Sequence, residues 1–304
     1  MAETYEIQST FNWQDLGDTD AYARWRRQKL AQSQALIDAR PVAIADLGAP
    51  TRSEMDEIIR RCEASNFAVY TSGEEADPEV IPEKLRGFAA AFALEIAEKH
   101  RSAQTHGIVA LEPSDAPAKR GYIPYSTRAL NWHTDGYYNA QQDNISAFVL
   151  HCVRPAPEGG TNQILDPEIA YIRLRDENPE FVRALMHPKA MTIPADHAAD
   201  GTVRPASIGP VFFADDATGR MQMRYTARTR SIEWRDDPVT EQATAFLLDL
   251  LQSGDPLMVE ITLAAGQGVL NNNVLHNRTG FAKGGDADRL LYRVRFHNRI
   301  ARST

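Results

Sequence analysis

Short strand-like runs fill the chain after residue 106, and they constrain the fold more than any other sequence feature. They span residues 108–111, 147–153, 191–193, 211–213, 221–225, 258–263, 268–270 and 289–297, and turns rich in Pro, Gly and Asp separate them. Two helical segments, residues 167–177 and 240–253, interrupt the series. Many short strands without βαβ alternation favour a sandwich or jelly roll over a doubly wound sheet. We therefore expect a mainly β fold with peripheral helices (α+β).

The first third of the chain has a different texture, with helix-forming patterns over residues 21–37, 54–65 and 82–100. Asp18 or Asp20 is placed to cap the first helix, and Thr51 with Glu54 forms a capping box for the second. The 304 residues suffice for one large core. We expect a single domain over 1–304, in which a helix-rich part (1–105) packs on a jelly-roll core (106–300).

Three side chains are candidates for a metal site: His133, Asp135 and His276. Residues i and i+2 of a strand point to the same face, so His133 and Asp135 can reach one ion. His276 arrives much later, within Asn271–Thr279. Two imidazoles and one carboxylate on one face of a metal form the triad of non-haem Fe(II) oxygenases. The alternative for His133 is a structural histidine beside a turn formed by Asp135 and Gly136.

A strand with several arginines follows shortly after His276. In residues 289–296 the residue type alternates with period 2, so Arg289, Arg293 and Arg295 share one face. A solvated face is one explanation. The other is a buried guanidinium that binds a carboxylate in bidentate fashion, as a dicarboxylate co-substrate would require.

The order His-x-Asp, Gly-Gly with Thr, distal His and Arg resembles the Fe(II)/2-oxoglutarate-dependent dioxygenases of the taurine and dichlorophenoxyacetate dioxygenase group. Asn131–Asp135 is close to that family's metal segment, and Val274–Phe281 is similar to its distal segment. The resemblance implies a double-stranded β-helix, a cupin-like jelly roll, with the metal at one open end. It also implies Fe(II) and 2-oxoglutarate as cofactors and O₂ as the oxidant.

Carried over by position, the resemblance implies that His133, Asp135 and His276 bind iron and form the catalytic centre. Arg289 would pair with the distal carboxylate of 2-oxoglutarate, and Arg293 would lie nearer the substrate. Two further substrate contacts come from the residues themselves: Asn131, which shares a strand face with His133, and Tyr137, which follows the metal motif directly.

Two departures from the family pattern affect the surroundings of the metal. The family often has Gly-Gly-x-Thr, whereas this chain has Gly159–Asn162, so either Thr161 or Asn162 takes the 2-oxoglutarate position. Residues 271–273 are all Asn where the family often has Asp-Asn-Arg, so a supporting charge is lost there.

A second basic run holds Arg224, Arg228 and Arg230. These arginines could bind an anionic substrate, but acidic residues follow closely in the sequence. We expect ion pairs with Glu233, Asp236 and Asp237.

Composition narrows the function class. The net charge is −8, and no dense basic block marks a nucleic-acid surface. Cys62 and Cys152 are too far apart in the sequence for a local metal motif, and two thiols do not make a disulfide scaffold. The first residues show no signal peptide, and no apolar run is long enough to span a bilayer. We expect a cytoplasmic protein with no nucleic-acid or membrane partner.

The function predicted from these observations is hydroxylation of a small, anionic organic substrate, with release of succinate and CO₂. The alternative is a cupin-like metal hydrolase or isomerase that holds Zn²⁺ with the same three ligands. Arg289 separates the two classes, because a hydrolase needs no dicarboxylate clamp. A jelly roll that only binds ligands would not need an intact triad. The resemblance also implies a homo-oligomer, either a dimer or a tetramer.

Overall fold

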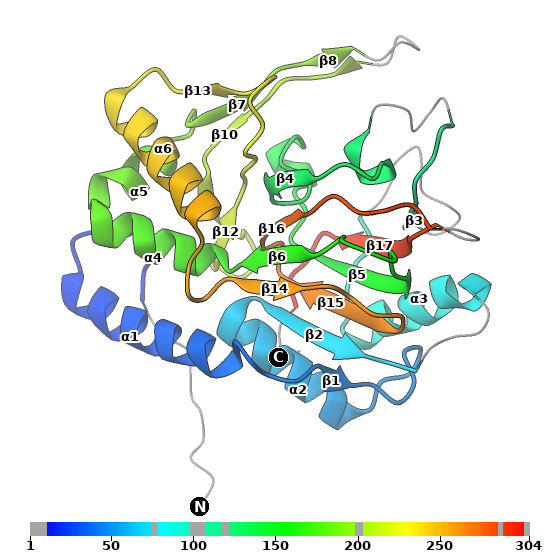
Figure 1. Ribbon diagram of the computed structural model, residues 1–304. Coiled ribbons are helices and arrows are strands. Elements are labelled where there is room, and N and C mark those ends of the chain that lie inside the picture. The colour runs from blue at the N-terminus through cyan, green and yellow to red at the C-terminus, as the bar shows by residue number, and fades with distance from the viewer. Residues whose placement is uncertain are drawn as a thin grey trace, which may run out of the picture.

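The computed structural model describes residues 11–73, 78–97, 107–116, 122–197, 203–284 and 288–300. The fold is mixed α/β, with several sheets and with helices around them (Figure 1). No signal peptide was expected at the start of the sequence, and residues 1–10 lie outside the described residues. No helix in the described ranges combines the length and apolar character that a membrane crossing needs.

The larger sheet has six strands in the order β1-β2-β15-β5-β17-β3. Their bounds are β1 (Val42–Ala43), β2 (Phe67–Thr71), β15 (Gln267–Asn271), β5 (Ala147–Arg154), β17 (Leu290–Phe296) and β3 (Ile108–Leu111). Only β1 and β2 pair in parallel; the other neighbours are antiparallel. The N-terminal third therefore contributes two strands to this sheet as well as helices.

A second sheet of four antiparallel strands has the order β14-β6-β16-β4. It is formed by β14 (Val259–Ile261), β6 (Asn162–Leu165), β16 (Leu275–Arg278) and β4 (Leu130–His133). Cys152, Val269 and Leu291 from the larger sheet and Ile164 from the smaller one form one buried apolar cluster. The two sheets thus share an interior.

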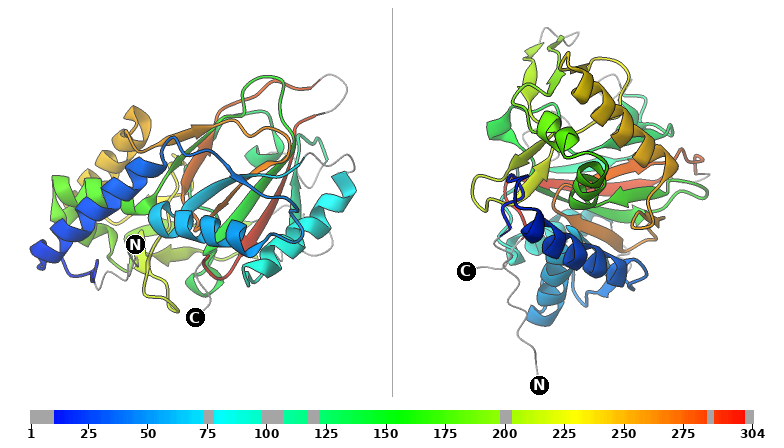
Figure 2. Two further views of the ribbon diagram at one scale, coloured as in Figure 1. Left: turned by 90° about the horizontal axis from the view of Figure 1, so that it is seen from below. Right: turned by 90° about the vertical axis from the view of Figure 1, so that its left-hand side faces the viewer.

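The outer face of the six-stranded sheet is covered by α2 (Arg52–Ser65) and α3 (Ile81–Ala91) (Figure 2). Alternation along β17 explains this packing, because Leu290, Tyr292, Val294 and Phe296 all join the apolar cluster beneath these helices. The capping box of Thr51 and Glu54 is present at the start of α2.

The third predicted helix ends earlier than the sequence pattern indicates. It was expected to run to His100, but α3 ends at Ala91, and Ala93 takes a left-handed conformation (φ 51°). Ile96 then forms a β-bridge with Phe296 and is partly exposed. Pairing with the sheet outweighs helix propensity here. Residues 98–100 lie outside the described residues.

Four helices and three small sheets flank the paired sheets at one side. The helices are α1 (Thr19–Leu36), α4 (Pro167–Glu177), α5 (Pro179–Leu185) and α6 (Pro238–Ser253). The strands are β7 (Met191–Ile193), β8 (Asp196–His197), β9 (Val203–Arg204), β10 (Ser207–Gly209), β11 (Phe212–Ala214), β12 (Met221–Met223) and β13 (Glu233–Trp234). Asp18 caps α1, while α5 was not expected from the sequence. A large apolar cluster joins α4, α5 and α6 to these strands and to Leu275 beside the candidate metal site.

A buried charge cluster fixes α1 against α4. The Lys29 ammonium lies 2.6 Å from Asp166 and also pairs with Glu168, and both Lys29 and Asp166 are about 3% exposed. Asp166 additionally caps α4 and accepts a hydrogen bond from Asn66 at the end of α2. One cation therefore pairs with two carboxylates, of which Asp166 is buried and Glu168 is 16% exposed.

Replacing Lys29 with alanine is expected to lower the free energy of unfolding by about 3–5 kcal/mol, because Asp166 and Glu168 then lose their counter-charge. Urea unfolding followed by circular dichroism measures this loss. The control is Arg26→Ala, which lies on α1 like Lys29. It breaks the more exposed ion pair between Arg26 and Asp176 of α4 and should cost less than about 1 kcal/mol. Equal losses in the two variants would contradict this role of Lys29.

Candidate metal centre

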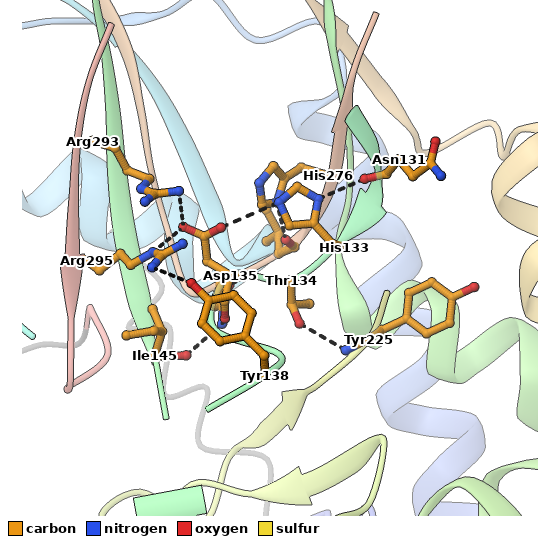
Figure 3. A network of polar contacts seen from close by, with 12 residues as sticks. Asn131, His133, Thr134, Asp135, Tyr138, Ile145, Tyr225, His276, Arg293 and Arg295 are labelled. Atoms are coloured by element: carbon orange, nitrogen blue, oxygen red, sulfur yellow. Dashed lines mark hydrogen bonds and ion pairs between the residues drawn. The ribbon is translucent and has the colours of Figure 1, made fainter. Parts of the chain in front are cut away.

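Two neighbouring strands bring the predicted metal ligands together. His133 on β4 and His276 on β16 are direct partners in the antiparallel ladder, and their ring centroids are 4.2 Å apart. Asp135 follows β4, with an oxygen 3.5 Å from His133 Nε2. One ligand atom of each residue lies within 4.8 Å of the others. The three residues thus form a compact cluster of two nitrogens and one carboxylate oxygen (Figure 3).

Both imidazoles are held in an orientation that suits a metal ligand. The Nδ1 of His133 lies 2.8 Å from the carbonyl oxygen of Asn131, and the Nδ1 of His276 lies 3.0 Å from that of Val274. A carbonyl only accepts, so each Nδ1 carries the proton and each Nε2 keeps its lone pair for a metal. Burial, together with the nearby His133, lowers the pKa of His276 to about 3. His276 is therefore neutral at physiological pH, as a ligand must be.

The Asp135 carboxylate is held by two arginines of β17. Arg295 donates from Nε to Oδ2 at 2.7 Å, and Arg293 Nη1 lies 3.4 Å from the same oxygen. Burial alone would raise the pKa of Asp135, but these two charges outweigh it and hold the pKa well below its usual range. Arg295 also contacts the Tyr138 hydroxyl at 3.2 Å. Oδ1 faces His133, which leaves this oxygen for a metal.

Neither Arg295 nor Tyr138 was among the predicted site residues. The signal for Arg295 was present, because it shares a strand face with Arg289 and Arg293. Its partner could not be known before the strand was placed beside Asp135. Tyr138 had no signal beyond its nearness in the sequence to the metal motif.

Asn273 supports the backbone of the metal motif. Its side-chain oxygen accepts from the Asp135 amide at 2.7 Å, and its nitrogen donates to the carbonyls of Asp135 and Ile145. The residue is buried and adopts a left-handed conformation (φ 53°), which asparagine tolerates better than most residues. From the sequence, a supporting charge is expected to be missing at residues 271–273. An amide provides support there instead, through three hydrogen bonds.

Replacing Asn273 with glycine keeps the left-handed backbone but removes these three bonds. We expect the affinity for Mn²⁺, measured by calorimetric titration, to fall about ten- to hundred-fold, as for other residues that orient metal ligands. Asn66→Gly is the matched control, because Asn66 is also left-handed (φ 61°) and buried, but lies at the end of α2. An equal loss of metal affinity in both variants would show that the effect is general destabilisation.

The Gly-Gly segment meets Arg289 directly before β17, the strand that carries Arg293 and Arg295. Gly159 and Gly160 both have positive φ, and a Cβ on Gly160 would lie 3.2 Å from Arg289 Nε. The Arg289 side chain is 5% exposed and stacks on Phe281 at 5.1 Å. Within the described ranges no carboxylate pairs with its guanidinium, and burial lowers its pKa. A buried cation of this kind favours an anionic ligand.

The structure places the side chains of Thr161 and Asn162 differently. Asn162 is buried and shares a strand face with Ile164, which belongs to the apolar interior between the two sheets. Its side chain also makes a long contact with the Gly160 carbonyl. The Thr161 hydroxyl instead pairs with that of Thr262 at 2.7 Å. Asn162 therefore faces the interior that contains Arg289, and Thr161 does not.

The predicted substrate contacts differ in their placement. Tyr137 lies edge-on to His133, with ring centroids 6.3 Å apart. Arg293 reaches Asp135, and its buried Nε has no hydrogen-bond partner in the described part of the chain. The side chain of Asn131 is exposed, and its carbonyl makes the contact with His133.

The expected ion pairs of the second basic run are absent from the described residues. Arg224 is buried and donates to the carbonyls of Tyr137, Met191 and Ser207. It therefore braces the loop after the metal motif. Asp237 pairs with Arg235, at 3.7 Å, and not with Arg228 or Arg230. The expectation was wrong because Arg224 points into the interior, where backbone oxygens are its partners.

Comparison with known proteins agrees with this geometry. The family model described as "Taurine catabolism dioxygenase TauD, TfdA family" matches residues 27–295. A uridine-5′-phosphate dioxygenase from Amycolatopsis sp. is 27% identical over 275 residues, covering 84% of this chain and 91% of that protein. A protein of the same name from Streptomyces sp. is 30% identical over 175 residues, covering 56% of this chain and 62% of that protein.

Solved structures share the fold at low sequence identity. The non-haem iron oxygenase OrfP, in complex with Fe, succinate and (3S)-hydroxy-L-Arg, superposes with a TM-score of 0.62 at 17% identity, covering 89% of this chain and 91% of its own. PvcB from Pseudomonas aeruginosa gives a TM-score of 0.56 at 17% identity, covering 85% and 84%.

Fold and site together define a non-haem iron oxygenase that uses 2-oxoglutarate, as the sequence predicted. Within that class, the chain belongs to the TauD/TfdA dioxygenase family, whose model matches nearly its whole length.

Proposed function

We propose that this chain hydroxylates a small anionic molecule, using Fe(II), 2-oxoglutarate and O₂ and releasing succinate and CO₂. The observation that carries the proposal is the pairing of two features. A compact cluster of two histidines and one aspartate contacts Arg293, and four residues earlier on that strand face lies Arg289, a buried arginine that no described carboxylate neutralises. The first feature suits Fe(II), and the second suits the distal acid group of a dicarboxylate. A hydrolase would need only the first.

In this proposal His133 and His276 hold the iron through Nε2, and Asp135 holds it through Oδ1. Bound iron with 2-oxoglutarate would supply the oxidising power to hydroxylate an unactivated C–H bond. Arg289 binds the distal carboxylate of 2-oxoglutarate, and Asn162 donates to one of its carboxylates. Arg295 keeps Asp135 ionised and turned toward the metal, and Arg293 offers its free Nε to an acid group close to the metal.

We infer that the core of the protein is a double-stranded β-helix within one domain over 1–304. The two facing sheets and their shared interior support this, as does the pairing of β2 with β15, which ties the N-terminal third into the larger sheet. The ligands then lie on the four-stranded sheet and the arginines on the six-stranded one, so both sheets build the site.

The substrate class we favour is a phosphate monoester or a similar anion. Two relatives are named uridine-5′-phosphate dioxygenases. The substrate in that name carries a phosphate group, so we take phosphate as the acid group of the substrate. The arginines around the metal ligands support an anionic substrate independently. Tyr137 and Asn131 border the same region.

The test is succinate formation from 2-oxoglutarate in the presence of Fe(II), ascorbate and O₂, together with thermal melting in Mn²⁺ and 2-oxoglutarate. We expect slow succinate release without substrate and a higher melting temperature when both ligands are present. A protein that binds the metal but gains no stability from 2-oxoglutarate, and forms no succinate, would be better explained as a cupin-like hydrolase.

A further inference from the structure

A short extended segment lies directly beside the strand that carries His133. Thr226 forms a β-bridge with His133. The bridge is flanked by backbone hydrogen bonds from Ala227 to Trp132 at 2.8 Å and from Thr134 to Tyr225 at 3.0 Å. Opposed residues in a ladder share a face of the sheet, so Thr226 points to the same side as His133.

Arg228 is two residues beyond Thr226, so extending the register past this isolated bridge would bring it opposite Asn131, on the face of Thr226 and His133. The Arg228 guanidinium lies over the ring of Tyr137, 5.7 Å from its centroid. Tyr137 in turn lies edge-on to His133. One tyrosine ring therefore separates Arg228 from the metal ligands.

Arg228 is half-buried, and in the described part of the chain its guanidinium contacts the ring of Tyr137. The acidic residues that follow it in the sequence do not neutralise it. The Tyr137 ring therefore lies against a cation whose fork of donors fits oxyanions, and Thr226 is two residues from that cation in the chain.

We propose that Arg228, with Thr226 and Tyr137, binds the phosphate-type acid group of the substrate. This inference rests on the proposed function and names the residues that select the substrate. The site is separate from Arg293, whose Nη1 pairs with Asp135 and whose Nε is left for an acid group close to the metal. The substrate then spans the Tyr137 ring, with its acid group at Arg228 and its reacting carbon next to the metal ligands.

The experiment compares binding of uridine-5′-phosphate, ribose-5-phosphate and uridine to the full chain loaded with Mn²⁺ and 2-oxoglutarate, by calorimetry. The variants are Arg228→Gln, Arg228→Lys and Arg230→Gln. Arg230 is the matched control, because it is exposed, lies two residues away and has no recorded contact with the site. Arg228→Lys keeps the charge but loses the planar fork.

We expect both phosphate esters to bind the wild type and Arg230→Gln. In Arg228→Gln their dissociation constants should rise roughly ten- to hundred-fold, since hydrogen bonds between charged groups are lost. Arg228→Lys should lie between these limits, and the affinity for uridine should not depend on residue 228. A purely structural role of Arg228 would instead weaken all three probes together.

The proposal is overturned if Arg228→Gln binds the phosphate esters as the wild type does. It is also overturned if neither ester binds the wild type while Mn²⁺ and 2-oxoglutarate still stabilise it. In the second case the proposed function survives without this substrate class. If Mn²⁺ and 2-oxoglutarate themselves fail to stabilise the wild type, the proposed function fails first.

Discussion

Replacing Asp135 with alanine is expected to abolish succinate formation and to lower the metal affinity more than about hundred-fold. Loss of a residue that merely orients a ligand already costs about ten- to hundred-fold, and Asp135 is the one anionic member of the cluster. The change also leaves Arg293 and Arg295 without their shared counter-charge in a buried environment. We therefore expect a second effect, a loss of about 3–5 kcal/mol in the free energy of unfolding of the metal-free protein.

Asp135→Asn removes the same charge but keeps the volume of the side chain and an oxygen for Arg295, so the difference from alanine measures the part due to lost packing and hydrogen bonding. Metal content by atomic absorption and unfolding in urea are measured for both variants. Asp249→Ala, on the exposed face of α6, is the control for removal of one carboxylate. Stoichiometric iron in both Asp135 variants, with unchanged succinate formation, would mean that another residue completes the metal site.

Local patterns in the sequence predicted many of the helices and strands and the three candidate metal ligands. Period-2 alternation located β17 to within one residue at each end, because its two faces meet an apolar layer on one side and the site on the other. The capping box marked α2 for a similar reason, since its hydrogen bonds join residues three positions apart. The His-x-Asp spacing predicted that His133 and Asp135 lie together, although only His133 is on a strand and Asp135 lies in the turn that follows it. These features are set by neighbours in the chain and can be read from it.

Features that depend on pairing between distant segments could not be read in this way. The length of α3 was overestimated, because the bridge between Ile96 and Phe296 joins residues two hundred positions apart. Arg224 was expected to meet nearby acids and instead meets backbone carbonyls of other segments. Asn273 is a further case, since its partners follow β4 and precede β5. Sequence order suggests partners that are close in the chain, but Ile96, Arg224 and Asn273 contact segments that are distant in the chain.

The charge of the site is opposite to that of the whole chain. The protein carries a net charge of −8, yet Arg293 and Arg295 pair with Asp135, Arg289 precedes them on the same strand, and Arg228 lies over Tyr137. Such a local excess of positive charge raises the concentration of anions at the site, while the acidic remainder discourages non-specific binding of nucleic acid. Two anionic reactants, a dicarboxylate and an acidic substrate, need more than one cation. The distribution of the arginines suggests separate positions for each.

Replacing Arg289 with glutamine is expected to raise the concentration of 2-oxoglutarate needed for half-maximal succinate formation roughly hundred-fold, with metal content retained. Removing one partner of a buried, hydrogen-bonded charge pair costs about 2–5 kcal/mol. Without 2-oxoglutarate the guanidinium has no partner among the described carboxylates, so the unliganded variant should melt no lower than the wild type. The gain in melting temperature on adding 2-oxoglutarate should largely disappear.

Two further variants serve as controls for Arg289→Gln. Arg289→Lys keeps the charge but not the bidentate geometry, so its requirement for 2-oxoglutarate should lie between those of the wild type and Arg289→Gln. Arg183→Gln makes the same chemical change on the exposed surface of α5 and should leave the requirement unaltered. Loss of iron from Arg289→Gln with an unchanged response to 2-oxoglutarate would contradict the assignment, because Arg289 would then support the metal ligands and not the co-substrate.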